Sequence, residues 1–189
     1  MIDGYRIEGH AIVSADDRIA DRDGNTPPEL SNEADWLRFQ DALDAAAVVI
    51  LGRLSHAANP NTRRRNRLVI SSSATCCERR GDAWWWNPAE TPFADALKEV
   101  APEGGIVAVP GGRLIFDMFR QIGFDAFHLV RANAVRIPGG VPLFSAVDDG
   151  RTAAEILAAD GLVAGPAETI DPVADVILVV LRRGASRSA

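Results

Sequence analysis

Short runs rich in valine and isoleucine alternate with segments of helical periodicity along most of this chain, and this alternation restricts the fold more than any other feature. Strands that are buried on both faces read as such runs, and a helix between two of them makes a crossover that leaves the strands parallel. The sequence therefore predicts a three-layer α/β domain, in which a mostly parallel mixed sheet is flanked by helices. The predicted strands lie at 5–14, 47–51, 67–73, 105–110, 126–135 and 174–183, and the predicted helices at 32–43, 93–100, 111–123 and 152–161.

The same pattern predicts how several elements are bounded. Residues 15–31 are rich in Asp, Gly and Pro, and we expect them to form a long loop. Ser31 can cap the helix that follows, and Glu33 and Asp35 lie in its first turn, where acidic side chains favour a helix N-terminus. The last apolar run, 174–183, is expected to be an edge or closing strand.

Length and charge point to one ordinary domain. The chain has 189 residues and a formal net charge of -6, so it can bury a full core, and its acidity argues against nonspecific binding of nucleic acid. We expect a single domain over 1–183 and a flexible tail at 184–189. No signal-peptide pattern is present, and no apolar run approaches the roughly 20 residues that span a bilayer.

The cysteines and histidines bear on compartment and metal content. Cys76 and Cys77 are adjacent, and neighbours in sequence rarely form a bridge, so we expect reduced thiols in a cytoplasmic protein. No metal is expected, because metal-ligand spacing is missing among the three histidines, His10, His56 and His128.

Three predicted strands end in the same kind of chemistry. Gly-Arg-Leu-Ser (52–55), a serine run (71–73) and a Gly-Gly pair that opens a helix (111–112) each follow an apolar run. Ligands of open α/β sheets bind beyond the carboxyl ends of the strands. Glycines let the backbone approach a phosphate, a helix start offers free N–H groups, and arginine and serine add hydrogen bonds. Together the three ends predict a site for a molecule with several phosphates, such as a dinucleotide, although the G-x-G-x-x-G fingerprint is absent.

Five stretches follow one another in a familiar order. They are "AIVSADDRIA" (11–20), "VVILGRLSH" (48–56), "RLVISSS" (67–73), "VAVPGGRLIF" (107–116) and "GGVPLF" (139–144). From about residue 7 to 144 the chain resembles the dihydrofolate reductase-like superfamily. It is most similar there to the reductase domain of riboflavin biosynthesis, the C-terminal domain of the bacterial bifunctional deaminase-reductase. The first stretch is similar to that family's S-x-D-G-x-I-A turn, with Asp17 where glycine is commoner.

The resemblance implies that NADPH binds along the strand ends. It assigns the cofactor phosphates to the G-R-x-S motif, the adenosine 2′-phosphate side to the exit serines and the pyrophosphate to the Gly-Gly turn, whose peptide is cis in the family pattern. Arg53 and the serines lean toward NADPH rather than NADH. The cofactor residues that it implies are Ala11, Gly52, Arg53, Ser55, Ser71, Ser72, Gly111, Gly112, Arg113 and Leu114.

The resemblance also implies a catalytic acid on the first long helix, in the pattern acid-x-x-x-Phe. Asp35 and Phe39 fit that spacing, and Glu33 is the rival acid. An acid shielded from water there could hydrogen-bond a ring N–H and help to protonate the substrate nitrogen. The other interpretation is that both acids only complement the helix N-terminus. The further substrate contacts that the resemblance implies are Ser14, Asp16, Phe39 and Arg65. Arg65 falls where folate enzymes bind the carboxylate tail of the substrate, and in a riboflavin-type enzyme the same region could meet a ribose phosphate.

We therefore expect an NADPH-dependent reductase that acts on a small pyrimidine- or pteridine-like heterocycle, with no nucleic acid or membrane as partner. The S-x-D-x-x-I-A turn after the first strand favours the riboflavin-pathway reaction on a ribosylamino-pyrimidine. "TPPEL" (26–30) points the same way, because the folate enzymes commonly have Pro-Trp there. Dihydrofolate reduction is the alternative within the class, and a nucleotide-binding module without turnover is the alternative outside it. The resemblance also suggests a homodimer.

Overall fold

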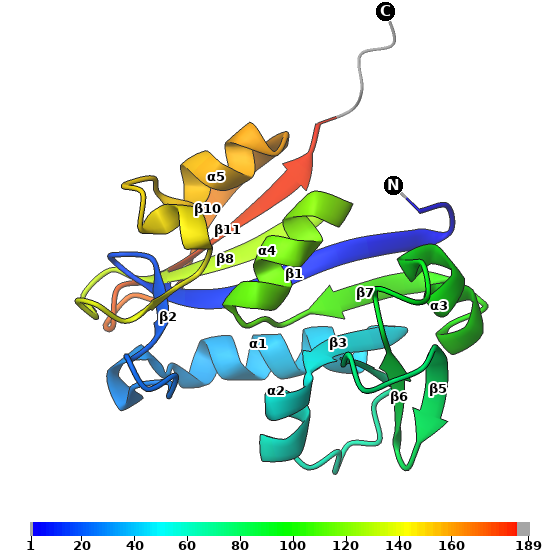
Figure 1. Ribbon diagram of the computed structural model, residues 1–189. Coiled ribbons are helices and arrows are strands. Elements are labelled where there is room, and N and C mark those ends of the chain that lie inside the picture. Colours follow the sequence, from blue (N-terminus) through cyan, green and yellow to red (C-terminus); the bar gives the residue numbers. More distant parts are fainter. Residues whose placement is uncertain (1, 185–189) are drawn as a thin grey trace, which may run out of the picture.

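The computed structural model describes residues 2–184 and contains a nine-stranded sheet (Figure 1). The strands from β8 to β6 run parallel to one another, whereas β10, β11 and β5 are antiparallel to their neighbours. The predicted mixed, mostly parallel sheet is confirmed. The predicted tail, apart from Gly184, lies outside the described residues. In the order of the sheet the strands are β10 (Leu162–Asp171), β11 (Val176–Arg183), β8 (Ala126–Ala132), β1 (Tyr5–Ser14), β7 (Gly105–Val109), β3 (Val48–Gly52), β4 (Arg67–Ile70), β6 (Ala83–Trp86) and β5 (Cys77–Arg80).

Strand β3 shows why the apolar runs are continuous. Val48 and Ile50 pack into the core on one face of the sheet, and Val49 and Leu51 into the core on the other. Successive side chains of a strand point to opposite faces, so a strand covered on both sides needs an apolar residue at every position.

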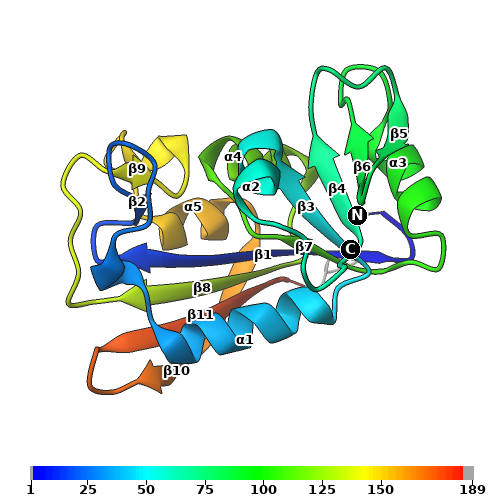
Figure 2. The same ribbon diagram turned by 90° about the horizontal axis from the view of Figure 1, so that it is seen from below.

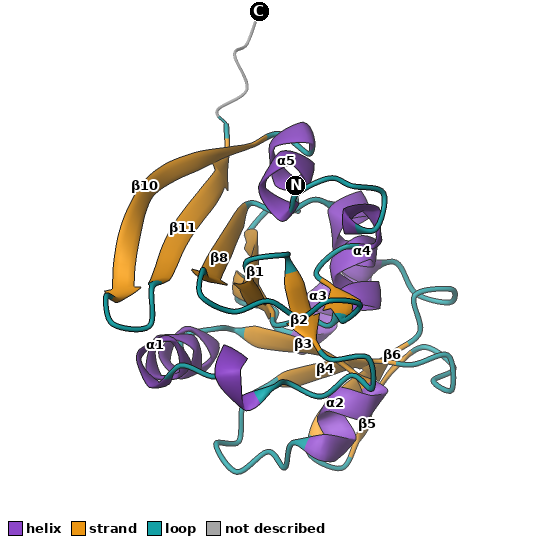
Figure 3. Cartoon of the chain, turned by 90° about the vertical axis from the view of Figure 1, so that its left-hand side faces the viewer, coloured by secondary structure: helices purple, strands orange, loops and turns teal. Residues whose placement is uncertain are grey.

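Helices cover both faces of the sheet, as predicted (Figures 2 and 3). On one face lies α1 (Glu33–Asp44), whose Leu43 and Phe39 pack over β3 and β7. The other face is covered by α3 (Phe93–Val100), α4 (Arg113–Ile122) and α5 (Ala153–Ala159), which share one apolar core with β1. A short helix, α2 (Arg53–Ala58), follows β3 directly. Within residues 2–184, no helix combines the length and the apolar character needed to cross a bilayer.

The N-terminal boundary of α1 corrects one prediction. Asn32, not Ser31, caps this helix, and its side-chain oxygen accepts a hydrogen bond from the backbone N–H of Asp35 at 3.0 Å. Ser31 instead ends a 3₁₀ turn, η1 (Pro28–Leu30), where its own N–H is bonded to the carbonyl of Pro28. The expected loop at 15–31 contains this turn and also β2 (Arg18–Ala20), which pairs with β9 (Val141–Pro142) in a separate two-stranded sheet.

The edges of the large sheet correct another prediction. Strand β11 does not lie at the edge, because β10 pairs outside it. Strand β10 carries Gly165 and Pro166 and is mostly exposed, so it lacks the apolar run that marks a buried strand. The pairing register shifts between Ala164 and Ala167, which accommodates the proline on an edge strand.

Candidate functional site

A cavity of about 750 Å³ opens between the N-terminal half of α1 and the carboxyl ends of β1 and β7. This is where open α/β sheets bind ligands. The walls come from the end of β1, the β2 region, the first turns of α1, the start of α2 and the turn after β7. Six residues predicted from the sequence line this one cavity: Ala11, Glu33, Asp35, Phe39, Ser55 and Gly112.

The two candidate acids differ in their surroundings. The side chain of Asp35 is buried, with 6 % of the residue exposed, whereas Glu33 lies exposed at the cavity wall. Asp35 Oδ1 accepts hydrogen bonds from Arg38 Nη2 at 2.9 Å and Nε at 3.3 Å. Arg38 also lines the cavity, and sequence reasoning missed it, although the i, i+3 spacing on a helix was a usable signal. A shielded carboxylate with a guanidinium partner is the acid that this cavity presents.

Two of the strand-end motifs, at Gly52 and at Gly111–Gly112, lie against each other. Gly112 caps α4, and its peptide bond to Gly111 is cis, as the resemblance implied. A Cβ on Gly111 would lie 2.5 Å from the ring of Phe116, so only glycine fits where the chain enters α4. A Cβ on Gly52 would lie 3.2 Å from Ile115, which places the end of β3 beside the first turn of α4. The two junctions therefore form one glycine-rich surface.

Arg53 begins α2 at the end of β3 and is exposed. Among the residues that the structure describes, no side chain is hydrogen-bonded or ion-paired with its guanidinium. Ser55, two residues further along α2, lines the cavity. Arg113 and Leu114 lie in the first turn of α4, and Leu114 is 75 % exposed. These groups are accessible to an anionic ligand.

The exit serines do not line the cavity. Ser71 is buried, its hydroxyl lies 2.8 Å from that of Ser73, and its N–H donates to the carbonyl of Trp86. Ser72 is exposed. Arg80 of β5 donates to the carbonyl of Ser73 at 2.9 Å, so the β5–β6 hairpin holds this loop. Ser72 is thus the freer of the two predicted contacts.

Ser14 ends β1 and Asp16 lies in the turn that follows, and neither lines the cavity. The Ser14 hydroxyl donates to Asp16 Oδ1 at 2.7 Å and accepts from the N–H of Arg18, and the N–H of Ile137 donates to the same carboxylate oxygen. Burial opposes ionisation of Asp16, but these hydrogen bonds hold its pKa below the usual value. The hydrogen bonds of both side chains therefore stabilise the turn that leads into β2.

Arg65 lies near the C-terminal end of α1, away from the cavity lining. Its Nε donates to Asp44 Oδ1 at 2.7 Å and its Nη2 to Gln40 Oε1 at 2.8 Å. These contacts tie the segment before β4 to α1. The predicted contact of Arg65 with a substrate carboxylate or phosphate stays a prediction.

His10 is a second cavity residue to which the sequence assigned no role in the site. It lies on β1 and lines the cavity, and only 1 % of the residue is exposed. Spacing along the chain gave no signal, since its neighbour His128 lies on β8 and reaches it only through the parallel pairing of the two strands.

Comparison with solved structures identifies the fold. Neither a family model nor a curated protein matches the sequence. The chain is similar to a pyrimidine reductase-like protein from Corynebacterium diphtheriae, with 12 % identity, coverage of 96 % of this chain and 93 % of that one, and a TM-score of 0.68. A dihydrofolate reductase from Enterococcus faecalis complexed with NADP(H) matches at 14 % identity over 97 % and 99 % of the two chains, with a TM-score of 0.61.

A third similar structure is a diaminohydroxyphosphoribosylaminopyrimidine deaminase/5-amino-6-(5-phosphoribosylamino)uracil reductase from Thermotoga maritima. It matches at 14 % identity with a TM-score of 0.63, over 95 % of this chain and 57 % of that one. The chain therefore has the dihydrofolate reductase-like fold. Its similar structures also include a putative riboflavin biosynthesis protein from Shewanella sp. PV-4, with 16 % identity, coverage of 95 % of this chain and 99 % of that one, and a TM-score of 0.63.

Proposed function

We propose that this protein is an NADPH-dependent reductase of the riboflavin-biosynthesis type, acting on a ribosylamino-pyrimidine such as 5-amino-6-(5-phosphoribosylamino)uracil. One observation carries the proposal: a single cavity joins the buried Asp35–Arg38 pair to the glycine-rich strand ends at Ser55 and Gly112. One part of the cavity suits a heterocycle with ring N–H and amino groups, and the other suits a phosphate-bearing cofactor.

The residues present fit NADPH. Gly112 has open space on the cavity side, since a Cβ there would meet nothing closer than Ile19 at 3.8 Å. Arg53 offers an exposed, always-charged guanidinium near the same junction. When bound, the cofactor supplies a hydride. The protein's own contribution is to align the two rings and to exclude water around them.

Asp35 has the proton-handling role in this proposal. Reduction of a C=N bond takes one hydride and one proton, so the protein must favour protonation of the substrate nitrogen while hydride arrives at carbon. The carboxylate can accept hydrogen bonds from the ring N–H or amino group of the substrate, which stabilises the positive charge that develops there. Arg38 holds the carboxylate in place at 2.9 Å.

Dihydrofolate reduction is the alternative reaction that the same acid and the same cavity could support. A cytoplasmic location and a homodimer belong to the proposal as well, on the grounds given by the sequence. Cys76 and Cys77 are both free thiols, and burial raises the pKa of Cys77 to about 11, which keeps that thiol protonated and unreactive.

Titration of the purified protein with NADPH and NADH, followed by fluorescence, tests the cofactor assignment. Arg53→Ala should weaken NADPH binding about tenfold, equivalent to about 1.4 kcal/mol, because it removes a charge-assisted hydrogen bond to phosphate. Arg79→Ala is the matched control, since Arg79 is equally exposed but lies on the β5–β6 hairpin. If neither nucleotide binds, the reductase proposal is wrong and only the fold remains.

A further inference from the structure

A buried polar cluster lies behind the cavity, on the face of the sheet that α1 covers. His10 of β1 pairs in register with His128 of β8, and their rings stack with centroids 4.4 Å apart and planes inclined by 14°. His128 Nε2 lies 3.1 Å from Glu8 Oε2, and Arg6 Nε lies 2.5 Å from Glu8 Oε1. Burial opposes ionisation of Glu8, but His128 and Arg6 hold its pKa below the usual value. The cluster fixes one imidazole, His128, through a carboxylate.

The other imidazole is not held in this way, because His10 Nε2 lies 3.9 Å from Glu8 Oε2, too far for a hydrogen bond. Neither ring nitrogen of His10 has a hydrogen-bond partner among residues 2–184, although only 1 % of the residue is exposed to solvent. Leaving a buried donor or acceptor without a partner destabilises the folded protein, so such a group calls for an explanation. His10 also lines the cavity, which makes the ligand of that cavity the natural partner.

The charge state of His10 defines what it can bind. Burial lowers the pKa of His10 to about 3, positive charge on His128 and Arg38 acts in the same direction, and Glu8 opposes it. The ring is therefore neutral at physiological pH, with one N–H donor and one nitrogen acceptor. A neutral imidazole recognises the polar edge of an uncharged ring and gives no advantage to an anion.

We propose that His10 is a specificity-determining residue of the cavity, which hydrogen-bonds the polar edge of a planar aminopyrimidinedione. This inference rests on the proposed function, since it names the substrate edge for the same site. The ring of Phe39 packs edge-on against His10 with centroids 6.4 Å apart, and both residues line the cavity. His128 and Glu8 act as positioning residues, because the stack and the 3.1 Å contact fix the plane of the His10 ring.

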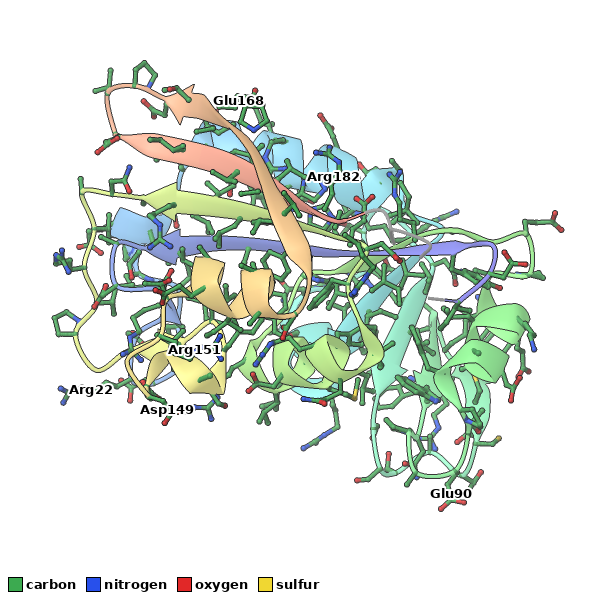
Figure 4. The ribbon with its side chains drawn as sticks, turned by 90° about the horizontal axis from the view of Figure 1, so that it is seen from above. Arg22, Glu90, Asp149, Arg151, Glu168 and Arg182 are labelled. Atoms are coloured by element: carbon green, nitrogen blue, oxygen red, sulfur yellow. The ribbon has the colours of Figure 1, made fainter. Side chains whose placement is uncertain are left out.

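A hydrogen-bonding ligand fits this cluster better than a metal cation. One ligand atom each from Glu8, His10 and His128 lies within 4.8 Å of the others, which is the spacing of a loose metal site. However, the imidazoles are stacked at 14°, so their in-plane lone pairs run side by side and do not converge on one point. Glu8 is also paired with Arg6, and both line an adjoining cavity of about 130 Å³ together with Arg182 of β11. Figure 4 labels Arg182. The pairing with Arg6 engages the carboxylate that a cation would need.

The experiment uses the full chain saturated with NADP⁺ and titrated with 6-aminouracil, followed by the imidazole NMR signals. The chain has only three histidines, so each ring is resolved, and His56 on α2 serves as the internal reference. We expect 6-aminouracil to shift the ring-nitrogen signals of His10 and to leave those of His56 in place. His10→Phe should weaken 6-aminouracil binding about tenfold, and His10→Gln, which keeps a donor and an acceptor, should recover most of it.

The outcomes separate this inference from the proposed function. Failure of NADP⁺ to bind any variant sinks the cofactor proposal, whereas normal NADP⁺ binding in His10→Phe shows that fold and cofactor site are intact. With NADP⁺ bound, an absent response to 6-aminouracil, or equal affinity in wild type and His10→Phe, overturns the role of His10. Binding of one equivalent of Zn²⁺ that His10→Phe abolishes would overturn it in favour of a cation site.

Discussion

The two sides of the cavity are built on different principles. The side formed by α1 and β1 carries buried polar groups: Asp35 is 6 % exposed and ion-paired, and His10 is 1 % exposed and its ring has no hydrogen-bond partner among residues 2–184. The side formed by the strand ends is lined by Gly112 and Ser55, with the exposed Arg53 next to them at the start of α2. Burial tunes protonation and selects hydrogen-bonding edges, whereas an open glycine-rich surface admits a phosphate. Mutations on one side of the cavity should therefore change catalysis, and mutations on the other side should change cofactor binding.

The strongest test of that separation is Asp35→Asn. It removes the negative charge that stabilises a protonated substrate nitrogen, so we expect kcat/KM to fall by about 10²–10⁴ with NADPH affinity unchanged. Steady-state kinetics with NADPH oxidation as readout, alongside fluorescence titration of the cofactor, measures both. Glu33→Gln makes the same charge change in the same turn at an exposed position, and its effect should be far smaller. Equal losses in both variants would mean that the first-turn acids act only through the field of the helix.

On the other side of the cavity, Gly111→Ala should be the most damaging change. Gly111 has a φ of 103°, and a Cβ there would lie 2.5 Å from the Phe116 ring, which is 1 % exposed and has little room to move. We expect the free energy of unfolding in urea to fall by about 2–4 kcal/mol, from the left-handed backbone and the overpacked ring together.

Gly112→Ala is the matched control, because its Cβ would meet only Ile19 at 3.8 Å. Its unfolding free energy should stay close to wild type, while NADPH binding weakens as the methyl group intrudes on the cavity. A large loss of stability in Gly112→Ala would show that this turn tolerates no side chain at either position, and the two glycines would then share a structural role.

The same contrast explains how much of the fold could be predicted from the sequence. The buried strands and the helices that cross between them carry their periodicity locally, so their order and the mixed sheet were predictable. The predicted helix 93–100 coincides with α3. Strand β10 was missed because an exposed edge strand with Gly165 and Pro166 has no apolar run. Strand β5, Cys77–Arg80, was missed for a related reason: it carries three charged residues and is an edge strand that pairs with β6.

The candidate site divides in the same way. The glycine motifs are local in sequence, and Ser55 and Gly112 could be named from their spacing to the preceding strands. His10 could not be named, because its place in the site depends on the register of β1 with β8. That register brings together His10 and His128, which are 118 positions apart in the sequence. Partners of predicted residues were missed for the same reason: the contact of Arg65 with Gln40 and Asp44 joins two elements whose docking the sequence does not specify.

A smaller effect should appear in the pH dependence of stability. In the folded protein the pKa of His10 is about 3, below its ordinary value of 6.5, so between these values the unfolded chain binds the extra proton. The stability that comes from keeping His10 neutral is fully present above pH 6.5 and is lost as the pH falls toward 3. Linkage at about 1.4 kcal/mol per pH unit gives a loss of about 2 kcal/mol between pH 7 and pH 5. Urea unfolding should show this loss in wild type and not in His10→Phe. Parallel curves for the two proteins would mean that His10 is protonated in the native state.

The smallest effect that still sharpens the comparison concerns Ser55. Its hydroxyl lies at the cavity, whereas the hydroxyl of Ser71 is already bonded to Ser73 at 2.8 Å. A neutral hydrogen bond contributes about 0.5–1.5 kcal/mol, so Ser55→Ala should weaken NADPH binding about threefold to tenfold. Ser71→Ala should change NADPH affinity less and stability more, because Ser71 is buried and leaves Ser73 without its partner. If Ser71→Ala instead had the larger effect on affinity, the loop after β4 would rearrange when the cofactor binds, and this side of the cavity would not be preformed.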